Sequence, residues 1–139
     1  MIRSIVVDDD RDFRLLVRIW MEKIAPARYE VVGEAASGDE CMELVEKLRP
    51  DLVLLDLTMP RTDPYEVIHD VVHRYPGTGV IVISGFDSDR VEAAVIASGA
   101  LGYLEKTASV ARLRERIDNL LAGFDPAIDE DLDAASMIR

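Results

Sequence analysis

The chain has 139 residues, 49% of them hydrophobic, and a formal net charge of −11. This length supports one hydrophobic core and is too short for two ordinary domains. Nucleic acids and anionic membranes are bound through clustered Lys and Arg, so the acidic balance argues against this chain alone binding either, and favours a cation or a basic partner. No apolar run reaches the roughly 18 residues of a membrane span. The first residues lack the layout of a signal peptide, and we therefore expect a cytoplasmic protein.

Five short apolar segments have the length and flanking residues of strands, and a helical pattern follows each one. The predicted strands are residues 2–7, 29–35, the Leu- and Val-rich run that ends at Asp56, 80–83 and 101–104. Between the first two, apolar residues including Leu16 and Trp20 recur at helical spacing until Pro26. Ser37 and Glu40 have the form of a capping box that opens the second helix. This alternation predicts an α/β fold with one doubly wound parallel sheet of five strands, flanked by five helices.

Two features at helical positions have simple structural interpretations. Cys41 lies among apolar residues at helical spacing, which predicts a small buried side chain. His69 and His73 lie one turn apart and could share a metal ion. No third ligand accompanies them in the sequence, so we expect a solvated helix face.

Polar side chains occur where the predicted strands end. Asp8 and Asp9 follow the first strand, Asp56 ends the third, Ser84 follows the fourth, and Lys106 lies near the end of the fifth. The carboxyl ends of parallel strands meet at one edge of an open α/β sheet, where ligands bind. Three carboxylates in one cleft repel each other unless a cation lies among them, and oxygen ligands with several retained waters suit Mg²⁺. The pattern indicates nucleophilic attack by a carboxylate on phosphorus, with Ser84 and Lys106 neutralising the phosphoryl group.

Four segments together resemble the receiver domains of two-component response regulators. They are residues 6–10 (VVDDD), 50–60 (PDLVLLDLTMP), 82–85 (VISG) and 99–106 (GALGYLEK). The run KTAS at residues 106–109 is similar to receivers of the NarL and LuxR type. The resemblance implies a flavodoxin-like strand order, 2-1-3-4-5, and a receiver domain over residues 1–122. Residues 123–139 carry five acidic residues, and we expect an acidic tail or linker there.

The resemblance also implies roles for the acidic residues. Asp56 would accept a phosphoryl group from the phosphohistidine of a sensor histidine kinase or a phosphotransfer protein. Asp9, Asp56 and the backbone carbonyl of Thr58 would bind Mg²⁺ directly, and Asp8 would act mostly through a bound water.

Other roles implied by the resemblance concern the phosphoryl group itself. Ser84 and Lys106 would contact the phosphoryl oxygens, and Tyr103 would be the switch aromatic that turns inward when Ser84 is drawn toward the phosphate. Thr58 and Phe86 flank the expected path of attacking water and would modulate the lifetime of the phosphorylated state. The resulting change of surface would involve the fourth helix, the fifth strand and the fifth helix.

The chain departs from the usual receiver pattern at two positions. Pro64 stands where glycine usually follows Asp63, and proline cannot adopt a positive φ, so we expect this loop to be rebuilt. Thr107 replaces the proline that usually follows the lysine. A cis bond without proline costs roughly 3 kcal/mol, so we expect a trans bond between Lys106 and Thr107.

We therefore predict a phosphorylation-controlled switch and not an enzyme, with at most weak self-dephosphorylation. Two alternatives remain open from the residues. An aspartyl-phosphate phosphohydrolase would use Asp56-Leu57-Thr58, but its motif needs a second acid where Thr58 stands. A phosphorylation-independent adaptor would be consistent with Pro64 and Thr107. A homodimer through the last helices is a further expectation, although the mixed charges there fit a solvated face equally well.

Overall fold

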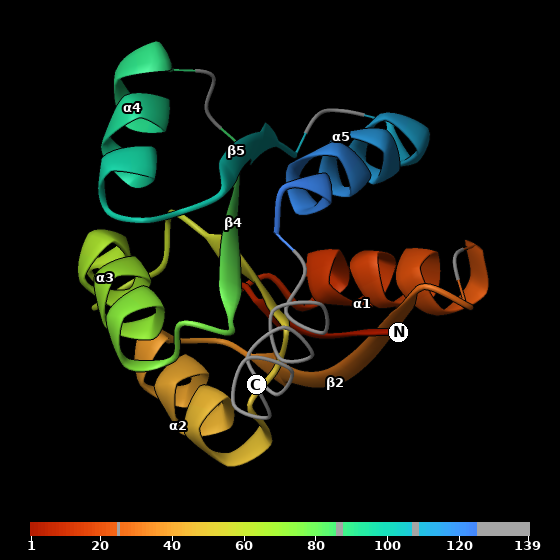
Figure 1. Ribbon diagram of the computed structural model, residues 1–139, viewed down its shortest axis with the longest axis horizontal. Helices are drawn as coiled ribbons and strands as arrows, with labels where there is room; N and C mark the ends of the chain where they lie inside the picture. The colour runs from red at the N-terminus through yellow and green to blue at the C-terminus, as the bar shows by residue number, and fades with distance from the viewer. Residues whose placement is uncertain (25, 86–87, 107–108, 125–139) are drawn as a thin grey trace, which may run out of the picture.

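The computed structural model describes residues 1–24, 26–85, 88–106 and 109–124 (Figure 1). Five strands form one sheet in the order β2-β1-β3-β4-β5, and every neighbouring pair is parallel. This arrangement confirms the predicted fold class and strand order. The strands are β1 (Ile2–Val7), β2 (Tyr29–Ala35), β3 (Leu52–Asp56), β4 (Gly79–Ser84) and β5 (Gly102–Glu105).

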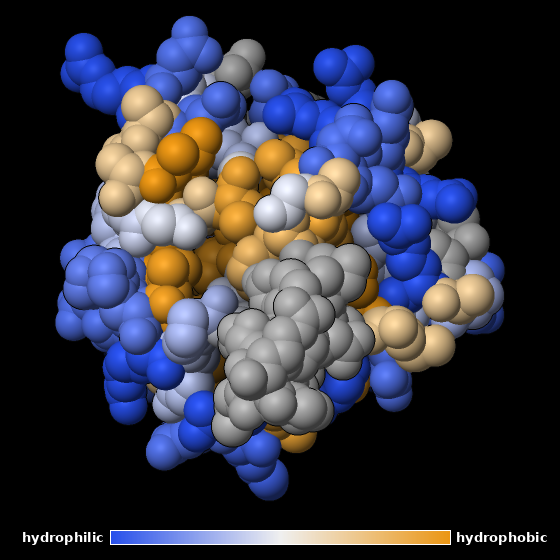
Figure 2. Space-filling view, in the orientation of Figure 1, coloured by the Kyte–Doolittle hydropathy of each residue, from blue (hydrophilic) through white to orange (hydrophobic). Residues whose placement is uncertain are grey.

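Helices cover both faces of the sheet, because the right-handed crossover from β1 to β2 runs in the opposite direction to the crossovers that follow it. They are α1 (Arg11–Ile19), α2 (Gly38–Leu48), α3 (Pro64–Arg74), α4 (Asp89–Ala97) and α5 (Val110–Ala122). Helices α1 and α5 lie on one face, and α2, α3 and α4 lie on the other (Figure 1). Hydrophilic side chains cover the outer surfaces of the helices, whereas hydrophobic ones are visible between them around the central strands (Figure 2).

Strand β3 is the middle strand of the sheet, and both of its faces are buried. Val53 and Leu55 belong to the core cluster beneath α2–α4, and Leu52 and Leu54 belong to the cluster beneath α1 and α5. None of these four side chains is more than 1% exposed. Burying one such side chain contributes about 1.5–3 kcal/mol, so the strand that ends at Asp56 is held firmly in place.

Helix α1 continues into a π-helical turn, Trp20–Ile24, which the sequence analysis did not predict. The wider turn brings both Trp20 and Met21 into the core, where they are 4% and 0% exposed. The apolar spacing grouped Leu16 with Val17 and Trp20 on one helical face, which was correct for Val17 and Trp20 and wrong for Leu16. Leu16 is 50% exposed, and Leu15 beside it is 54% exposed.

The two simple helix interpretations agree with the structure. Cys41 is fully buried in α2, and burial raises the pKa of its thiol to about 12. His69 and His73 lie on the exposed surface of α3, where their rings stack with centroids 3.9 Å apart. Within the described ranges, neither histidine belongs to a group of three side chains that could hold a metal ion.

Candidate functional site

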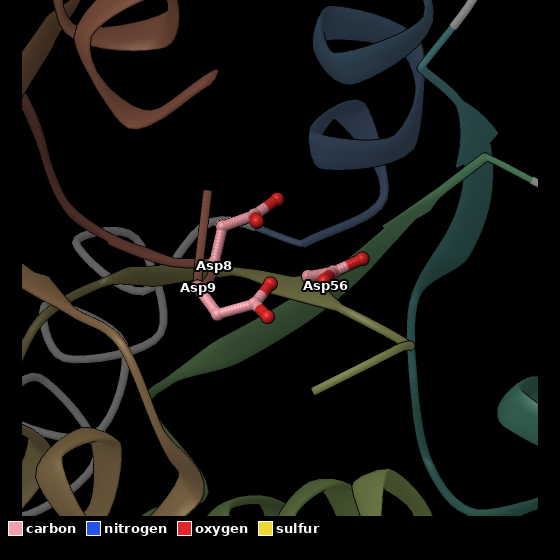
Figure 3. A group of neighbouring side chains, drawn as sticks. All are labelled: Asp8, Asp9 and Asp56. Carbon is pink, nitrogen blue, oxygen red and sulfur yellow. The ribbon is translucent and has the colours of Figure 1, made fainter. Parts of the chain in front are cut away.

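Three carboxylates converge at the carboxyl-terminal edge of the sheet (Figure 3). Asp8 and Asp9 directly follow β1, and Asp56 is the last residue of β3, the neighbouring strand. A ligand oxygen of each lies within 4.8 Å of the other two. Asp8 and Asp56 are 1% and 4% exposed, whereas Asp9 is open to solvent. An oxygen-only donor set with one solvent-facing member fits a hard divalent cation that keeps part of its water shell.

The loop between β1 and α1 is shaped by its own acidic residues. The Asp10 side chain is the N-cap of α1 and accepts hydrogen bonds from the backbone N–H groups of Asp12 and Phe13. Asp8 Oδ1 accepts the Asp10 N–H at 2.8 Å, which turns the Asp8 side chain along the loop. Asp10 therefore has a capping role, while Asp8 and Asp9 face Asp56.

Among the described residues, Lys106 is the one whose ammonium group lies among these carboxylates. It directly follows β5, and its Nζ lies 2.7 Å from Asp8 Oδ2 and 3.4 Å from Asp56 Oδ1. Nζ also lies 4.5 Å from the centre of the Phe13 ring, a cation–π contact. Ser84 ends β4 and is fully buried, and its carbonyl accepts the Lys106 N–H at 2.8 Å.

The charges at this edge do not balance. Burial raises the pKa of Asp56, and the Asp8 carboxylate raises it further. Lys106 and a hydrogen bond from the Thr58 backbone N–H act in the opposite direction without cancelling this effect. Burial would lower the pKa of Lys106, but its contacts with Asp8 and Asp56 outweigh burial and raise it. One ammonium group among three carboxylates leaves a site that favours a further cation.

A cleft of about 510 Å³ adjoins Asp9. It runs between the loops that precede α2 and α3, and its lining includes four further acidic residues: Asp39, Asp63, Glu66 and Asp70. Arg61 is the basic residue in the lining. An acidic cleft raises the local concentration of cations, so a hydrated metal ion has a favourable path to Asp9.

The loop after Asp56 is built around Pro64. Pro64 is the first residue of α3, where proline is well tolerated, and Asp63 is the N-cap. Its side chain accepts the N–H groups of Tyr65 and Glu66. The positive φ in this loop, 57°, falls at Arg61. The loop thus makes its left-handed turn three residues before the proline, and Thr58 lies exposed between Asp56 and that turn.

Tyr103, the predicted switch aromatic, lies on β5 and is 4% exposed. It belongs to the core cluster that also contains Val82 of β4 and Val95 of α4. Its backbone carbonyl accepts a hydrogen bond from Arg116 of α5 at 3.3 Å. Tyr103 therefore lies where β5 contacts both α4 and α5. Phe86, Thr107 and the predicted tail from residue 125 onward lie outside the described residues.

Two residues that touch the site were not identified from the sequence. Phe13 lies under Lys106, and Arg14 Nη1 donates a hydrogen bond to the backbone carbonyl of Asp8 at 2.6 Å. Arg14 follows Phe13 at the edge of the apolar stripe of α1, where a long cationic side chain can fold back over the first turn. The position of Arg14 in the sequence could have indicated a side chain that folds over the first turn of α1. Its hydrogen-bond partner, the Asp8 carbonyl, depends on the tertiary structure and could not be predicted in this way.

The fold and this constellation define a class of protein, and comparison with known proteins identifies it. Residues 5–118 match the model of the response regulator receiver domain family, and the chain belongs to that family. Over 118 residues it is 30% identical to the chemotaxis protein CheY of Thermotoga maritima, covering 85% of this chain and 96% of that protein. Over 124 residues it is 34% identical to the transcriptional regulatory protein DegU of Brevibacillus brevis, covering 88% of this chain. The chain spans 51% of the length of DegU.

Solved structures of the same class superpose closely on this chain. The signal receiver domain of the response regulator NarL from Mycobacterium tuberculosis has a TM-score of 0.80 at 30% identity, covering 88% of this chain and 97% of that one. A LuxR-family response regulator from an Aurantimonas species has a TM-score of 0.81 at 26% identity, covering 100% and 99%. These similarities agree with the NarL- and LuxR-type resemblance of the sequence.

No helix in the described part of the chain has both the length and the apolar character needed to cross a membrane.

Proposed function

We propose that this receiver is a phosphorylation-controlled switch in which Asp56 accepts a phosphoryl group from a histidine kinase or a phosphotransfer protein. One observation carries the proposal. Asp56 is a nearly buried carboxylate that shares a 4.8 Å cluster with Asp8 and Asp9 and lies 3.4 Å from the ammonium group of Lys106. A carboxylate placed among two acids and one lysine is suited to receive and hold a phosphoryl group.

In this reaction an Asp56 carboxylate oxygen attacks phosphorus as the bond from phosphorus to the histidine nitrogen breaks. The departing imidazole nitrogen recovers its lone pair, and an acyl phosphate forms on Asp56. Lys106 is positioned to neutralise charge on the transferring oxygens, and Ser84 at the end of β4 offers a hydroxyl on the same edge. Slow release of the phosphoryl group to water would return the switch to its unphosphorylated state.

Magnesium fits the donor set of this site. Asp8, Asp9, Asp56 and the Thr58 carbonyl are the residues that would hold it, all through oxygen. When bound, Mg²⁺ neutralises the carboxylates and the phosphoryl oxygens. The chain's own contribution would be to keep the Asp8 and Asp56 carboxylates buried and close together, at the ends of β1 and β3, before the ion arrives.

The output of the switch would be a changed surface at α4, β5 and α5. The acyl phosphate would carry about two negative charges where the carboxylate carried one, and its oxygens would draw the Ser84 hydroxyl and Lys106 toward Asp56. Tyr103 lies one strand away from Ser84, in register with Val82, and its backbone is linked to Arg116 of α5. Movement at the end of β4 would therefore reach α5 through β5 and alter the face offered to a partner.

Incubation of the chain with acetyl phosphate or phosphoramidate and Mg²⁺, followed by intact mass measurement, tests the proposal. We expect one phosphoryl group per chain, none on Asp56→Asn, and an unchanged result on Asp51→Asn. Asp51 is the matched control because it lies just before β3, at the opposite end of the same strand. An unmodified wild-type chain would instead support the adaptor alternative, and sustained turnover of small phosphate esters would support the phosphohydrolase.

A further inference from the structure

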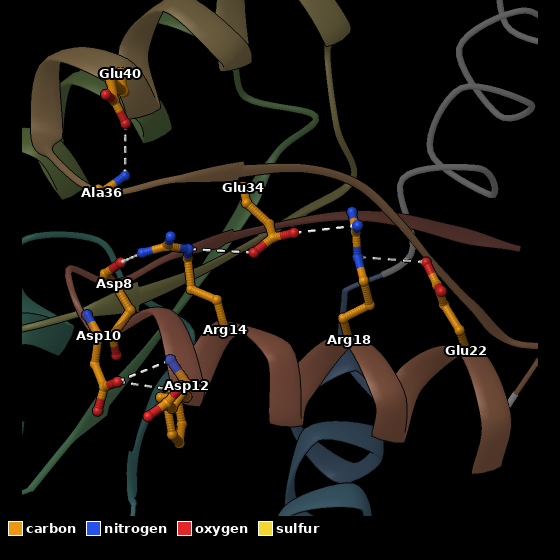
Figure 4. A network of polar contacts seen from close by, with 10 residues as sticks. Asp8, Asp10, Asp12, Arg14, Arg18, Glu22, Glu34, Ala36 and Glu40 are labelled. Carbon is orange, nitrogen blue, oxygen red and sulfur yellow. Dashed lines mark hydrogen bonds and ion pairs between the residues drawn. The ribbon is translucent and has the colours of Figure 1, made fainter.

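Arg14 connects the loop after β1, which carries Asp8 and Asp9, to the surface formed by α1 and β2 (Figure 4). Its side chain is only 16% exposed. Nη1 donates to the backbone carbonyl of Asp8 at 2.6 Å, and Nε lies 3.2 Å from Glu34 Oε1. The other oxygen of Glu34 lies 3.2 Å from Arg18 Nη1. One guanidinium group therefore bridges β2 and the loop that carries two of the three clustered carboxylates.

Arg14 binds the Asp8 carbonyl just beyond the point where the hydrogen-bond ladders of β1 end. Strand pairing of β1 with both of its neighbours stops at Val7. The Asp8 N–H still reaches the carbonyl of Ala35 at 3.0 Å, but the Asp8 carbonyl lies beyond the ladder and is bound by Arg14. That carbonyl belongs to the planar peptide between Asp8 and Asp9, so its orientation also sets the direction in which Asp9 leaves the strand.

We propose that Arg14, anchored by Glu34, is a positioning residue of the metal site. It orients the peptide between Asp8 and Asp9 so that both carboxylates face Asp56 before a divalent cation binds. The inference rests on the proposed function, because it assigns Arg14 a task in the cation binding that the function requires. Repulsion among the three carboxylates would otherwise favour loop conformations in which Asp9 turns away into solvent.

Arg14→Gln and Arg18→Gln form a matched pair of variants. Each removes one positive charge from α1 and one ion pair with Glu34. Arg18 differs in its remaining contact, which is with Glu22 at 3.7 Å and not with the loop. Loss of a positive charge near the site should by itself tighten binding of a cation. Weaker binding by Arg14→Gln would therefore oppose the electrostatic trend and indicate loss of positioning.

The experiment titrates the unphosphorylated full chain with Mg²⁺ alone by isothermal titration calorimetry, and circular dichroism checks that each variant is folded. We expect Arg14→Gln to raise the dissociation constant for Mg²⁺ about tenfold, as loss of a group that orients a metal ligand typically does. Arg18→Gln should change it less than twofold. Arg14→Lys keeps the charge but can reach only one of the two partners, so it should show an intermediate loss.

A second pair keeps the inference testable if Arg14→Gln does not fold. Glu34→Ala removes the side chain that anchors Arg14, whereas Glu22→Ala removes the same charge at the far end of the network. We expect weaker Mg²⁺ binding from the first and little change from the second. Equal affinity of Arg14→Gln and the wild type, or equal weakening within either pair, would overturn the role of Arg14 and leave the proposed function intact. Failure of the wild-type chain to bind Mg²⁺ would overturn the proposed function itself.

Discussion

The two ends of the parallel sheet differ in how their polar side chains are paired. At the amino-terminal end, two polar side chains form hydrogen bonds with neighbouring segments of the chain. Thr78 Oγ1 donates to the carbonyl of Pro50 at 2.6 Å, and Asp51 Oδ2 accepts the Arg3 N–H at 2.9 Å. Each of these two acceptors is matched by a donor from a neighbouring segment, so neither needs a ligand.

At the carboxyl-terminal end, the three clustered carboxylates share the single ammonium group of Lys106. Burial raises the pKa of Asp56 because its charge is poorly compensated there. From this difference we infer that the amino-terminal end serves stability and that the carboxyl-terminal end is suited to binding a cation. Substitutions at the amino-terminal end should change the free energy of unfolding alone, whereas those at the carboxyl-terminal end should change its dependence on Mg²⁺ and pH.

The largest expected effect is stabilisation by Mg²⁺. At a free concentration of 100 times the dissociation constant, a ligand that binds only the folded state adds about 2.7 kcal/mol to the free energy of unfolding. We expect this increment in the wild type and a much smaller one at the same concentration in Asp9→Asn, in which the solvent-facing carboxylate of the cluster becomes an amide. Urea unfolding with MgCl₂ or with NaCl at equal ionic strength measures it. Asp51→Asn, at the other end of the sheet, should keep the full increment, and an undiminished increment in Asp9→Asn would remove the distinction between the ends.

The sequence predicts the clustering of side chains at the carboxyl-terminal end well, because these residues lie at strand ends. An apolar run that stops at a carboxylate identifies both β3 and Asp56, and parallel topology then places Asp8, Asp9 and Lys106 nearby. These inferences need only local patterns and the rule that parallel strands end together. A different local pattern predicted a buried Cys41, because its apolar neighbours recur at helical spacing on one face.

Other features depend on contacts that no local pattern encodes. The bond from Arg14 to the carbonyl of Asp8 requires α1 to lie against β2, because Glu34 orients the guanidinium group. The π-helical turn after α1, in which Trp20 and Met21 are buried, gives no signal in apolar spacing. The left-handed residue of the loop after β3 is Arg61, although neither its type nor its neighbours predict a positive φ.

A smaller effect is expected from Thr78→Val at the amino-terminal end. The substitution keeps the shape of the side chain but removes the hydroxyl that donates to Pro50, leaving a buried carbonyl without that partner. This should cost about 1–2 kcal/mol of unfolding free energy in urea. Because the change lies at the end of the sheet remote from the carboxylates, the increment from Mg²⁺ should equal that of the wild type. A changed increment would mean that the two ends are coupled.

The smallest expected effect has the opposite sign. In EDTA at pH 7, Asp56→Asn should be more stable than the wild type by about 1 kcal/mol, the ordinary size of a single-substitution effect. Lys106 keeps its closer contact with Asp8, so the substitution removes a repelled charge without leaving the ammonium group unpaired. A loss of stability in this variant would mean that the Asp56 charge is well compensated in the free protein.

The pH dependence of this difference follows from the raised pKa of Asp56. Burial and the Asp8 carboxylate make protonated Asp56 the form that favours the fold. Its contribution to stability is complete below the unfolded pKa of about 3.9 and is lost as the pH rises through the folded pKa. Asparagine resembles the protonated acid at every pH and does not suffer this loss. The advantage of Asp56→Asn should therefore shrink as urea unfolding in EDTA is repeated from pH 7 down to pH 4, and a constant difference would show that the substitution acts through packing and not through charge.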